Sequence, residues 1–393
     1  MAWKECDRVS QRQELMTLAA AGGLSVAELA RRFGVSRKTV YKWMNRQAAH
    51  GSAGLTDQSR RPHHSPHRTP DAIQQQVLSL HQQHPAWGGR KLHHRLRHLG
   101  LNPPAPSTIT RILQDHRQII PSARRPGPWQ RFERALPNEL WQMDFKSPVP
   151  LVHGGQSHPL TVVDDHSRYA LALEACPDQK LPTVQKHLTR LFERYGLPWA
   201  MLSDNGSPFR SPGYGLTALE VWLMRLDVQF IHGRPYHPQT QGKDERFHRT
   251  VGVEVLQGRS FADAASLQEA LDPWRQVYNN QRPHESLDHH PPASRYRPSV
   301  RSMPAKLACI EYDAGDEVRR VDASGQVFFK GRRMRVGKAL TDQRVALRPT
   351  LIDGLWQVYY SRFRIGQLDL KAVAKGQFTH VLRSADENAR DSH

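Results

Sequence analysis

Residues 140–175 read LWQMDFKSPVPLVHGGQSHPLTVVDDHSRYALALEA, and their pattern indicates how the middle of the chain folds. Three apolar runs within it, at 140–145, 160–163 and 169–175, predict short β-strands joined by turns. An amphipathic segment follows at 181–195, where apolar residues at helical spacing predict a helix. The middle of the chain therefore begins as three strands and continues into a helix.

Beyond that helix, strands and helices alternate. Residues 199–202 predict a fourth strand that runs directly into Ser-Asp-Asn-Gly at 203–206. A helix at 216–226, a strand at 228–231 and a helix from Gly242 complete the pattern. Three strands, then helix, strand, helix, strand and helix, is the element order of an RNase H-like α/β domain, which we expect over residues 138–290.

Three carboxylates stand where this fold can bring them together. Asp144 lies inside an apolar strand, where a charge is costly unless it meets a cation or a donor. Asp204 follows the fourth strand at a tight turn, and Glu245 lies early in the helix that starts at Gly242. If the first and fourth strands are neighbours, these acids form an oxygen-rich site suited to two Mg²⁺ or Mn²⁺ ions.

Other acids compete for these roles. Asp164 and Asp165 are rivals for the metal site, but their sequence favours a structured connection between strands, with Asp165 paired to Arg168. Asp244 is the rival of Glu245. Adjacent helical residues point about 100° apart, so only one of the two faces the site, and the local pattern does not decide which.

The charge of the chain indicates a polyanionic partner. Lys and Arg number 56 against 37 Asp and Glu, a net charge of +19, and 22 of these cations against 8 acids precede Pro137. Neutralising phosphates explains so uneven a distribution directly. No run approaches the roughly 18 to 20 apolar residues of a membrane span. Three distant cysteines suggest neither a disulfide framework nor a zinc site, so we expect a cytoplasmic protein.

Residues 1–56 predict a first helix-turn-helix domain. Helices are expected at 11–21, from Ser25, which forms a capping box with Glu28, and at 37–45. The third of these helices is basic, as expected for a helix that docks in the major groove of DNA. Its candidate DNA contacts are Arg37, Lys38, Tyr41, Lys42 and Arg46.

A second helix-turn-helix domain is expected over residues 70–120, between linkers at 57–69 and 121–137. Pro70 opens its first helix, Leu92, Leu96 and Leu99 mark the second, and Ser107 opens the third. Five of its histidines have no Cys or carboxylate partners at metal spacing, so we interpret them as polar surface or phosphate contacts: His81, His84, His93, His94 and His98.

The C-terminal region predicts a small β-barrel. A proline-containing linker is expected at 291–304, the barrel at 305–377 and a disordered tail at 378–393. The expected strands are 317–321, 326–329, 332–336, 344–348, 356–360 and 363–368.

Four motifs in order resemble those of the DDE transposases of bacterial insertion sequences and of the related retroviral integrases. They are WQMDF at 141–145, TVVDDHSRY at 161–169, SDNG at 203–206 and HPQTQGKDERFHRT at 237–250. The resemblance implies that Asp144, Asp204 and Glu245 are the catalytic, metal-binding triad, because Glu245 and not Asp244 occupies the acidic position of G-K-x-E-R-F.

The same resemblance implies further roles. The helix of Glu245 would lie along DNA through Lys243, Arg246 and Arg249, while His237 and Gln239 would approach the scissile phosphate. Residues 279–287 would close the catalytic domain. The stretch WGGRKL at 87–92 is similar to the DNA-binding half of this group, which makes Arg90 and Lys91 candidate contacts.

The implied activity is transposition. The enzyme would hydrolyse phosphodiester bonds at the ends of a mobile element with Mg²⁺ or Mn²⁺ and join the 3′-hydroxyls to target DNA, as a homodimer or higher oligomer at the bacterial nucleoid. A catalytically silent DNA-binding regulator of transposase origin is the alternative, and an RNase H-type nuclease is a third.

Overall fold

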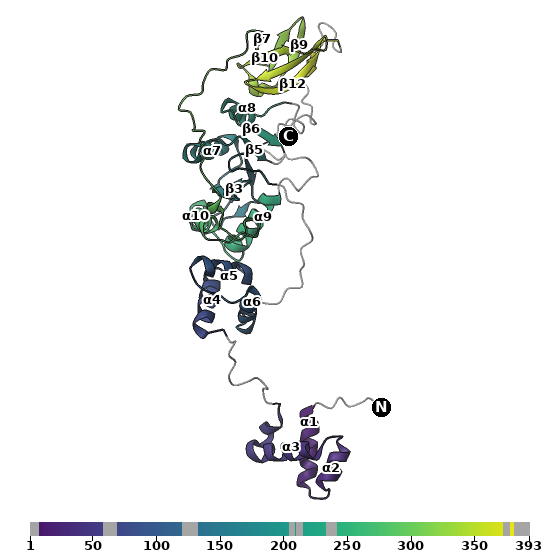
Figure 1. Cartoon of the computed structure of the whole chain (residues 1–393). Coiled ribbons are helices and arrows are strands. Elements are labelled where there is room, and N and C mark those ends of the chain that lie inside the picture. The colour runs from purple at the N-terminus through teal and green to yellow at the C-terminus, as the bar shows by residue number, and fades with distance from the viewer. Residues whose placement is uncertain are drawn as a thin grey trace. The chain divides into compact units, whose positions relative to one another are not determined.

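The computed structural model describes residues 8–57, 69–119, 133–203, 209, 215–232, 242–371 and 378–380 (Figure 1). Two compact units, residues 1–68 and 69–393, divide the chain and are treated separately below. Among the described residues, every helix is too short or too polar to cross a membrane.

The first unit is a helical bundle with the expected helix-turn-helix order. Its helices are α1 (Arg8–Ala20), α2 (Val26–Arg32), α3 (Arg37–His50) and the 3₁₀ turn η1 (Gly51–Leu55). Ser25 and Glu28 form the predicted capping box, and Ser36 caps α3. The core takes Val40 and Trp43 from α3, whereas Met44 is half-buried. The basic face of α3 is therefore exposed to solvent.

A second helical module begins the larger unit. It consists of α4 (Asp71–Gln83), α5 (Gly89–His98) and α6 (Pro106–Asp115). Leu92 and Leu96 are buried in its core as predicted, but Leu99 is 51% exposed because α5 ends one residue before it. Ser107 is not the N-terminal residue of the third helix as predicted, because α6 already begins at Pro106.

The central domain has the predicted element order, with one additional two-residue strand, β2, before the first helix. Its strands are β1 (Leu140–Phe145), β2 (Val149–Pro150), β3 (Gln156–Asp164), β4 (Ala170–Cys176), β5 (Ala200–Ser203) and β6 (Gln229–His232). The sheet runs β2-β3-β1-β5-β6, with β4 also paired to β3. β1 is antiparallel to β3 and parallel to β5, so β1 lies between the two halves of the sheet.

Helices cover both faces of this sheet. They are α7 (Leu181–Tyr195), α8 (Ala218–Arg225), α9 (Gly242–Val251), the π turn η3 (Gly252–Leu256) and α10 (Ala264–Asn280). α7 and α8 bury Phe192 and Leu223 in one core. α9 and α10 bury Phe247 and Leu271 in another. The helix α10 had no explicit counterpart in the sequence prediction.

Two predicted linkers are partly packed. In the segment 291–304, Tyr296 stacks on Tyr169 at 4.3 Å, and Arg301 donates to the Pro198 carbonyl at 2.6 Å. In the segment 121–137, the described residues from Glu133 onward also contact the core, because Arg168 binds Glu133. Both segments were predicted as linkers because they are rich in proline. Proline is equally compatible with an extended chain that packs against the surface of a domain. The expected linker at 57–69 falls almost wholly outside the described residues.

The C-terminal domain is made of short strands around one core. The strands are β7 (Glu317–Arg320), β8 (Gln326–Phe329), β9 (Arg332–Arg335), β10 (Arg344–Pro349), β11 (Leu355–Tyr360), β12 (Phe363–Asp369) and β13 (Phe378–His380). They form two sheets, β12-β11-β10-β7 and β13-β9-β8, in place of one continuous barrel ladder among the described residues. The predicted tail at 378–393 begins with β13, and its remainder lies outside the described residues.

Candidate active site

Asp144 lies near the end of β1, at the middle of the sheet. Its carboxylate is half-buried, and its Oδ1 accepts the Phe145 amide at 2.7 Å. The parallel neighbour β5 pairs Gln142 with Leu202 and ends at Ser203. Asp204 is the next residue along the chain and lies outside the described residues. The first and fourth predicted strands are thus neighbours, as the carboxylate hypothesis requires.

The helix α9 reaches this end of β1 through His248. Thr161, the strand partner of Asp144, donates its hydroxyl to the Asp144 carbonyl at 3.0 Å. His248 Nε2 lies 2.8 Å from the same hydroxyl, and its Nδ1 lies 3.9 Å from Asp144 Oδ2. Because that hydroxyl already donates, it accepts from Nε2–H, which favours this tautomer. Burial, and then the charge of Lys146, lowers the pKa of His248 to about 4, so the ring is neutral near pH 7.

The two adjacent acids of α9 lie in different surroundings. Glu245 is exposed, whereas Asp244 is 2% exposed and its Oδ1 has no hydrogen-bond partner among the described residues. Burial, and then the charge of Asp144, raises the pKa of Asp244 well above its ordinary value. Asp244 and Glu245 precede His248 by four and three residues, so each lies about one helical turn before it.

The chemistry of these side chains fits a hard divalent cation. Asp144, Asp244 and Glu245 supply carboxylate oxygens, the ligand type that Mg²⁺ and Mn²⁺ prefer. Within the described ranges, no three His, Cys, Asp or Glu side chains already form a cluster able to hold a metal ion. The expected third member of the triad, Asp204, is outside those ranges, so the convergence of the triad stays a prediction.

The rival acids Asp164 and Asp165 serve the strand connection. Asp164 accepts the Asn138 amide at 2.8 Å and the Ser167 amide at 2.8 Å. Asp165 accepts the Arg134 amide at 2.8 Å and the Gln142 side chain at 2.7 Å. Both are fully buried and committed to holding the β3–β4 turn against β1. Their interpretation as structural residues is therefore confirmed.

The predicted ion pair between Asp165 and Arg168 is wrong. Arg168 pairs with Glu133 at 2.7 Å, and the cation that meets Asp165 is Lys243 from α9. The Lys243 side chain is only 16% exposed, and burial lowers its pKa to about 8 despite the attraction of Asp165. The ammonium group is thus held within the protein by Asp165, and a contact of Lys243 with DNA stays an untested prediction.

Arg90 and Lys91 differ in their exposure to solvent. Arg90 pairs with Glu285 at 2.8 Å, although both side chains are largely exposed. Lys91 is half-buried, and burial followed by the charge of Arg282 lowers its pKa to about 8. These contacts arise because α5 packs on the central domain, where Arg95 donates to Gln281 at 3.0 Å. The basic face of α5 is therefore at least partly an internal surface.

Most of the remaining candidate DNA contacts that the structure describes are open to solvent. Arg246 and Arg249 are exposed on α9. On α3 the exposed candidates are Arg37, Lys38, Tyr41 and Lys42. Arg46 is half-buried, with its guanidinium 5.1 Å from the centre of the Trp43 ring. His237 and Gln239 lie outside the described residues.

Sequence reasoning missed the roles of His248, Thr161 and Lys243. The signal for His248 was present, because it follows Glu245 by three residues and shares its side of the helix. Nothing in the local sequence pairs Lys243 with Asp165, which is 78 positions away.

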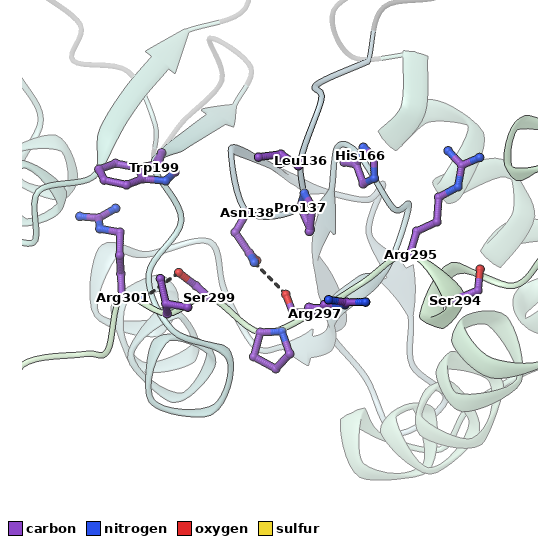
Figure 2. A pocket seen from close by; sticks show the side chains of 12 residues that line it. Leu136, Pro137, Asn138, His166, Trp199, Ser294, Arg295, Arg297, Ser299 and Arg301 are labelled. Atoms are coloured by element: carbon purple, nitrogen blue, oxygen red, sulfur yellow. Dashed lines mark hydrogen bonds between the residues drawn. The ribbon is translucent and has the colours of Figure 1, made fainter.

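A cavity of about 520 Å³ lies near the start of strands β1 and β5, at the opposite end of β1 from Asp144 (Figure 2). Asn138 and Trp199, which line it, precede β1 and β5, whereas Asp144 stands near the far end of β1. Of its arginines, Arg301 is bound to Asp227 and Arg295 to Glu133. Cationic side chains here are thus largely neutralised by the protein, and the cavity is separate from the candidate active site.

Family models match successive parts of the chain. The N-terminal part matches a helix-turn-helix domain at residues 11–63 and a homeodomain-like domain at 39–113. The centre matches integrase core domains at 134–238 and 226–292. The C-terminal part matches the C-terminal domain of IS481 family transposases at 316–376.

Similar proteins come from insertion elements. A 39.2 kDa protein of element IS476 from Xanthomonas euvesicatoria is 28% identical over 69% of this chain and 78% of its own length. A 31.7 kDa protein of element IS407 from Burkholderia multivorans is 30% identical over 40% of this chain and 54% of its own length.

A solved catalytic core of HTLV-2 integrase aligns with 41% of this chain and 97% of its own, with 13% identity and a TM-score of 0.32. The integrase core models, the IS481 C-terminal model and the insertion-element relatives agree with the element order and with the four motifs. These similarities together support a DDE-type transposase of the insertion-sequence kind, with an integrase-like core.

Proposed function

We propose that this transposase is catalytically active and uses Asp144, Asp204 and Glu245 as its metal-binding triad. The observation that carries the proposal is the position of Asp144. It stands between β5, which ends one residue before Asp204, and α9, which carries Glu245 and approaches within 3.9 Å through His248. Three elements that are far apart in the sequence thus meet around one strand end.

The expected cofactor is Mg²⁺ or Mn²⁺, with two ions per site. When bound, such ions activate an attacking water or 3′-hydroxyl and stabilise the leaving oxygen of a phosphodiester. The chain's own residues prepare the ligands. The Phe145 amide orients Oδ1 of Asp144, and the neutral His248 ring approaches Oδ2 without adding a positive charge that would compete with a cation.

The proposed substrate is double-stranded DNA, both the ends of the element and the target. The exposed face of α3 would read the ends, and Arg246 and Arg249 would lie along the backbone near the reacting phosphate. Lys243 is not part of this proposed surface. Arg90 and Lys91 would contribute only if the bound DNA also contacted α5. Cutting two paired ends calls for at least a homodimer.

The function is tested with purified full-length protein, candidate terminal-repeat DNA and Mg²⁺. Cleavage that releases 3′-hydroxyls, followed by their joining to a target duplex, is expected. Glu245→Gln should abolish both steps and leave end binding intact, because it removes the charge but keeps the volume of the side chain. Asp244→Asn tests the rival acid in the same assay.

The alternative functions give different results in this assay. Binding of the ends without metal-dependent cleavage would identify a transposase-derived regulator. Cleavage of RNA in a hybrid would identify an RNase H-type nuclease. If Asp244→Asn abolished cleavage and Glu245→Gln did not, Asp244 would replace Glu245 in the proposed triad.

A further inference from the structure

The first turn of α9 is tied to the sheet by one buried ion pair. The ammonium group of Lys243 contacts Oδ1 of Asp165 and donates to the Asp165 carbonyl at 3.2 Å. The two side chains are 16% and 0% exposed. Since water is largely excluded, the attraction between them is screened much less than that of a surface pair.

Asp165 is itself held in place from β1. Its Oδ1 accepts from Gln142 at 2.7 Å, and its backbone amide donates to the Leu140 carbonyl at 2.9 Å. Gln142 and Leu140 belong to the strand that carries Asp144. A continuous series of contacts therefore runs from the Asp144 strand through Asp165 to the second residue of α9.

This position is where a helix most needs an external restraint. The first amide groups of a helix lack partners within the helix, so its first turn is prone to fray. α9 begins at Gly242, whose backbone is less restricted than that of other residues. Glu245 lies in the same turn, three residues on, so the direction of its side chain depends on how this turn is held.

We propose that Lys243 is a positioning residue for Glu245. By binding Asp165, Lys243 fixes the first turn of α9 against the Asp144 strand and so holds the Glu245 carboxylate in the orientation that the metal site requires. The proposal rests on the proposed function, in which Glu245 is a metal ligand. It differs from a DNA-contact role, which would require the ammonium group to face solvent.

The test measures Mn²⁺ affinity of the full-length protein without DNA, by electron paramagnetic resonance. Lys243→Met and Asp165→Asn are each expected to weaken Mn²⁺ binding by about 10- to 100-fold, as found when residues that orient metal ligands are replaced. The double variant should lose no more than the worse single variant, because both changes break one interaction. Binding of terminal-repeat DNA should be unchanged.

A matched control lies on the same helix. Arg249→Met removes an exposed cation and should weaken DNA binding while leaving Mn²⁺ affinity as in the wild type. Lys243→Arg keeps the charge and should recover part of the Mn²⁺ affinity that Lys243→Met loses. If Lys243→Met does not fold, Lys243→Gln, which keeps a donor for Asp165, takes its place.

Two results would overturn the proposal. One is a Lys243→Met protein that binds Mn²⁺ as tightly as the wild type but binds DNA more weakly, which is the behaviour of a DNA contact. The other is strictly additive losses in the double variant, which mean that Lys243 and Asp165 act separately. A wild-type protein that binds no Mn²⁺ would instead remove the proposed function on which this inference rests.

Discussion

His94 of α5 lies flat against His289 of the segment that follows α10, with ring centroids 3.8 Å apart and 6° between the ring planes. One helical turn further on, His98 stacks on His290 at 5.3 Å. These two pairs join the second helix-turn-helix module to the central domain. The partly buried Val277 of α10 adds an apolar contact with the core of the module.

The stacked histidines make this junction sensitive to acid. Burial, and then the neighbouring His289, lowers the pKa of His94 to about 4, and burial also lowers the pKa of His98. The nearby cations Arg95 and Arg97 act in the same direction. Since the folded state binds fewer protons than an unfolded chain with ordinary histidine pKa values, stability is full above about pH 6.5 and falls as the pH drops towards 4.

We therefore expect faster hydrogen exchange of the α5 amide groups at pH 5 than at pH 7, after correction for the intrinsic rates. The double variant His289→Gln and His290→Gln removes the partner rings and should reduce this pH dependence. Exchange at α3, in the other unit, serves as the internal reference. Equal protection of α5 at both pH values would contradict the prediction.

Asn279 should prove important for the stability of the central domain. Its buried amide group accepts the Ala170 amide at 2.8 Å and donates to the Ala170 carbonyl at 3.0 Å, which joins α10 to β4. Asn279→Ala leaves two buried backbone groups without partners and should lower the free energy of unfolding by about 2–4 kcal/mol. Urea unfolding measures the change. Asn280→Ala, at an exposed neighbour, should stay within about 0.5 kcal/mol.

Lys38 is expected to contribute to DNA binding through phosphate charge. It is exposed on α3, the basic third helix of the first module. Lys38→Ala should weaken binding of the terminal repeat and lower the slope of log affinity against log salt by about one unit. Lys186→Ala, which removes the same charge from an exposed site on α7, should leave that slope unaltered. A similar slope for both variants would argue against docking through α3.

Arg301 should anchor the segment between the central and C-terminal domains. Its guanidinium donates to the Pro198 carbonyl at 2.6 Å and the Asp227 carbonyl at 2.8 Å, and it lies 4.2 Å from the centre of the Trp199 ring. Arg301→Ala should cost about 2–3 kcal/mol of unfolding free energy, measured by calorimetry, because charged hydrogen bonds to partly buried carbonyls are lost. Arg297→Ala, an exposed neighbour in Figure 2, should change stability little in the same calorimetric scan.

Most of the fold could be predicted because its elements have local signals. The period of apolar residues placed β1 and α7 at the residues where they occur, and the capping box at Ser25 placed the start of α2. Leu99 was misassigned because periodicity alone does not show that α5 ends at His98. The packing of the segment 291–304 on the core was not predicted, because its contacts, such as Tyr296 with Tyr169, join residues far apart in the sequence.

In the candidate site, too, features with local sequence signals could be predicted, whereas contacts between distant residues could not. The acidic candidates were proposed from their strand and helix positions and from the motifs, which are properties of short stretches, and their convergence stays a prediction. The partner of Lys243 was not, since the ion pair with Asp165 depends on how α9 is laid across the sheet. The same holds for Arg90, whose partner Glu285 lies 195 positions away.

The helix α8 belongs to two hydrophobic cores at once. Leu219 and Leu223 pack into the sheet, while Val221, Met224 and the preceding Leu216 pack into the C-terminal domain. A recombinant catalytic fragment that ends at about residue 304 would consequently expose these three apolar side chains to solvent. Such a fragment would be prone to aggregate. Crystallisation or assay of an isolated core would call for polar replacements at 221 and 224, or for keeping the C-terminal strands attached.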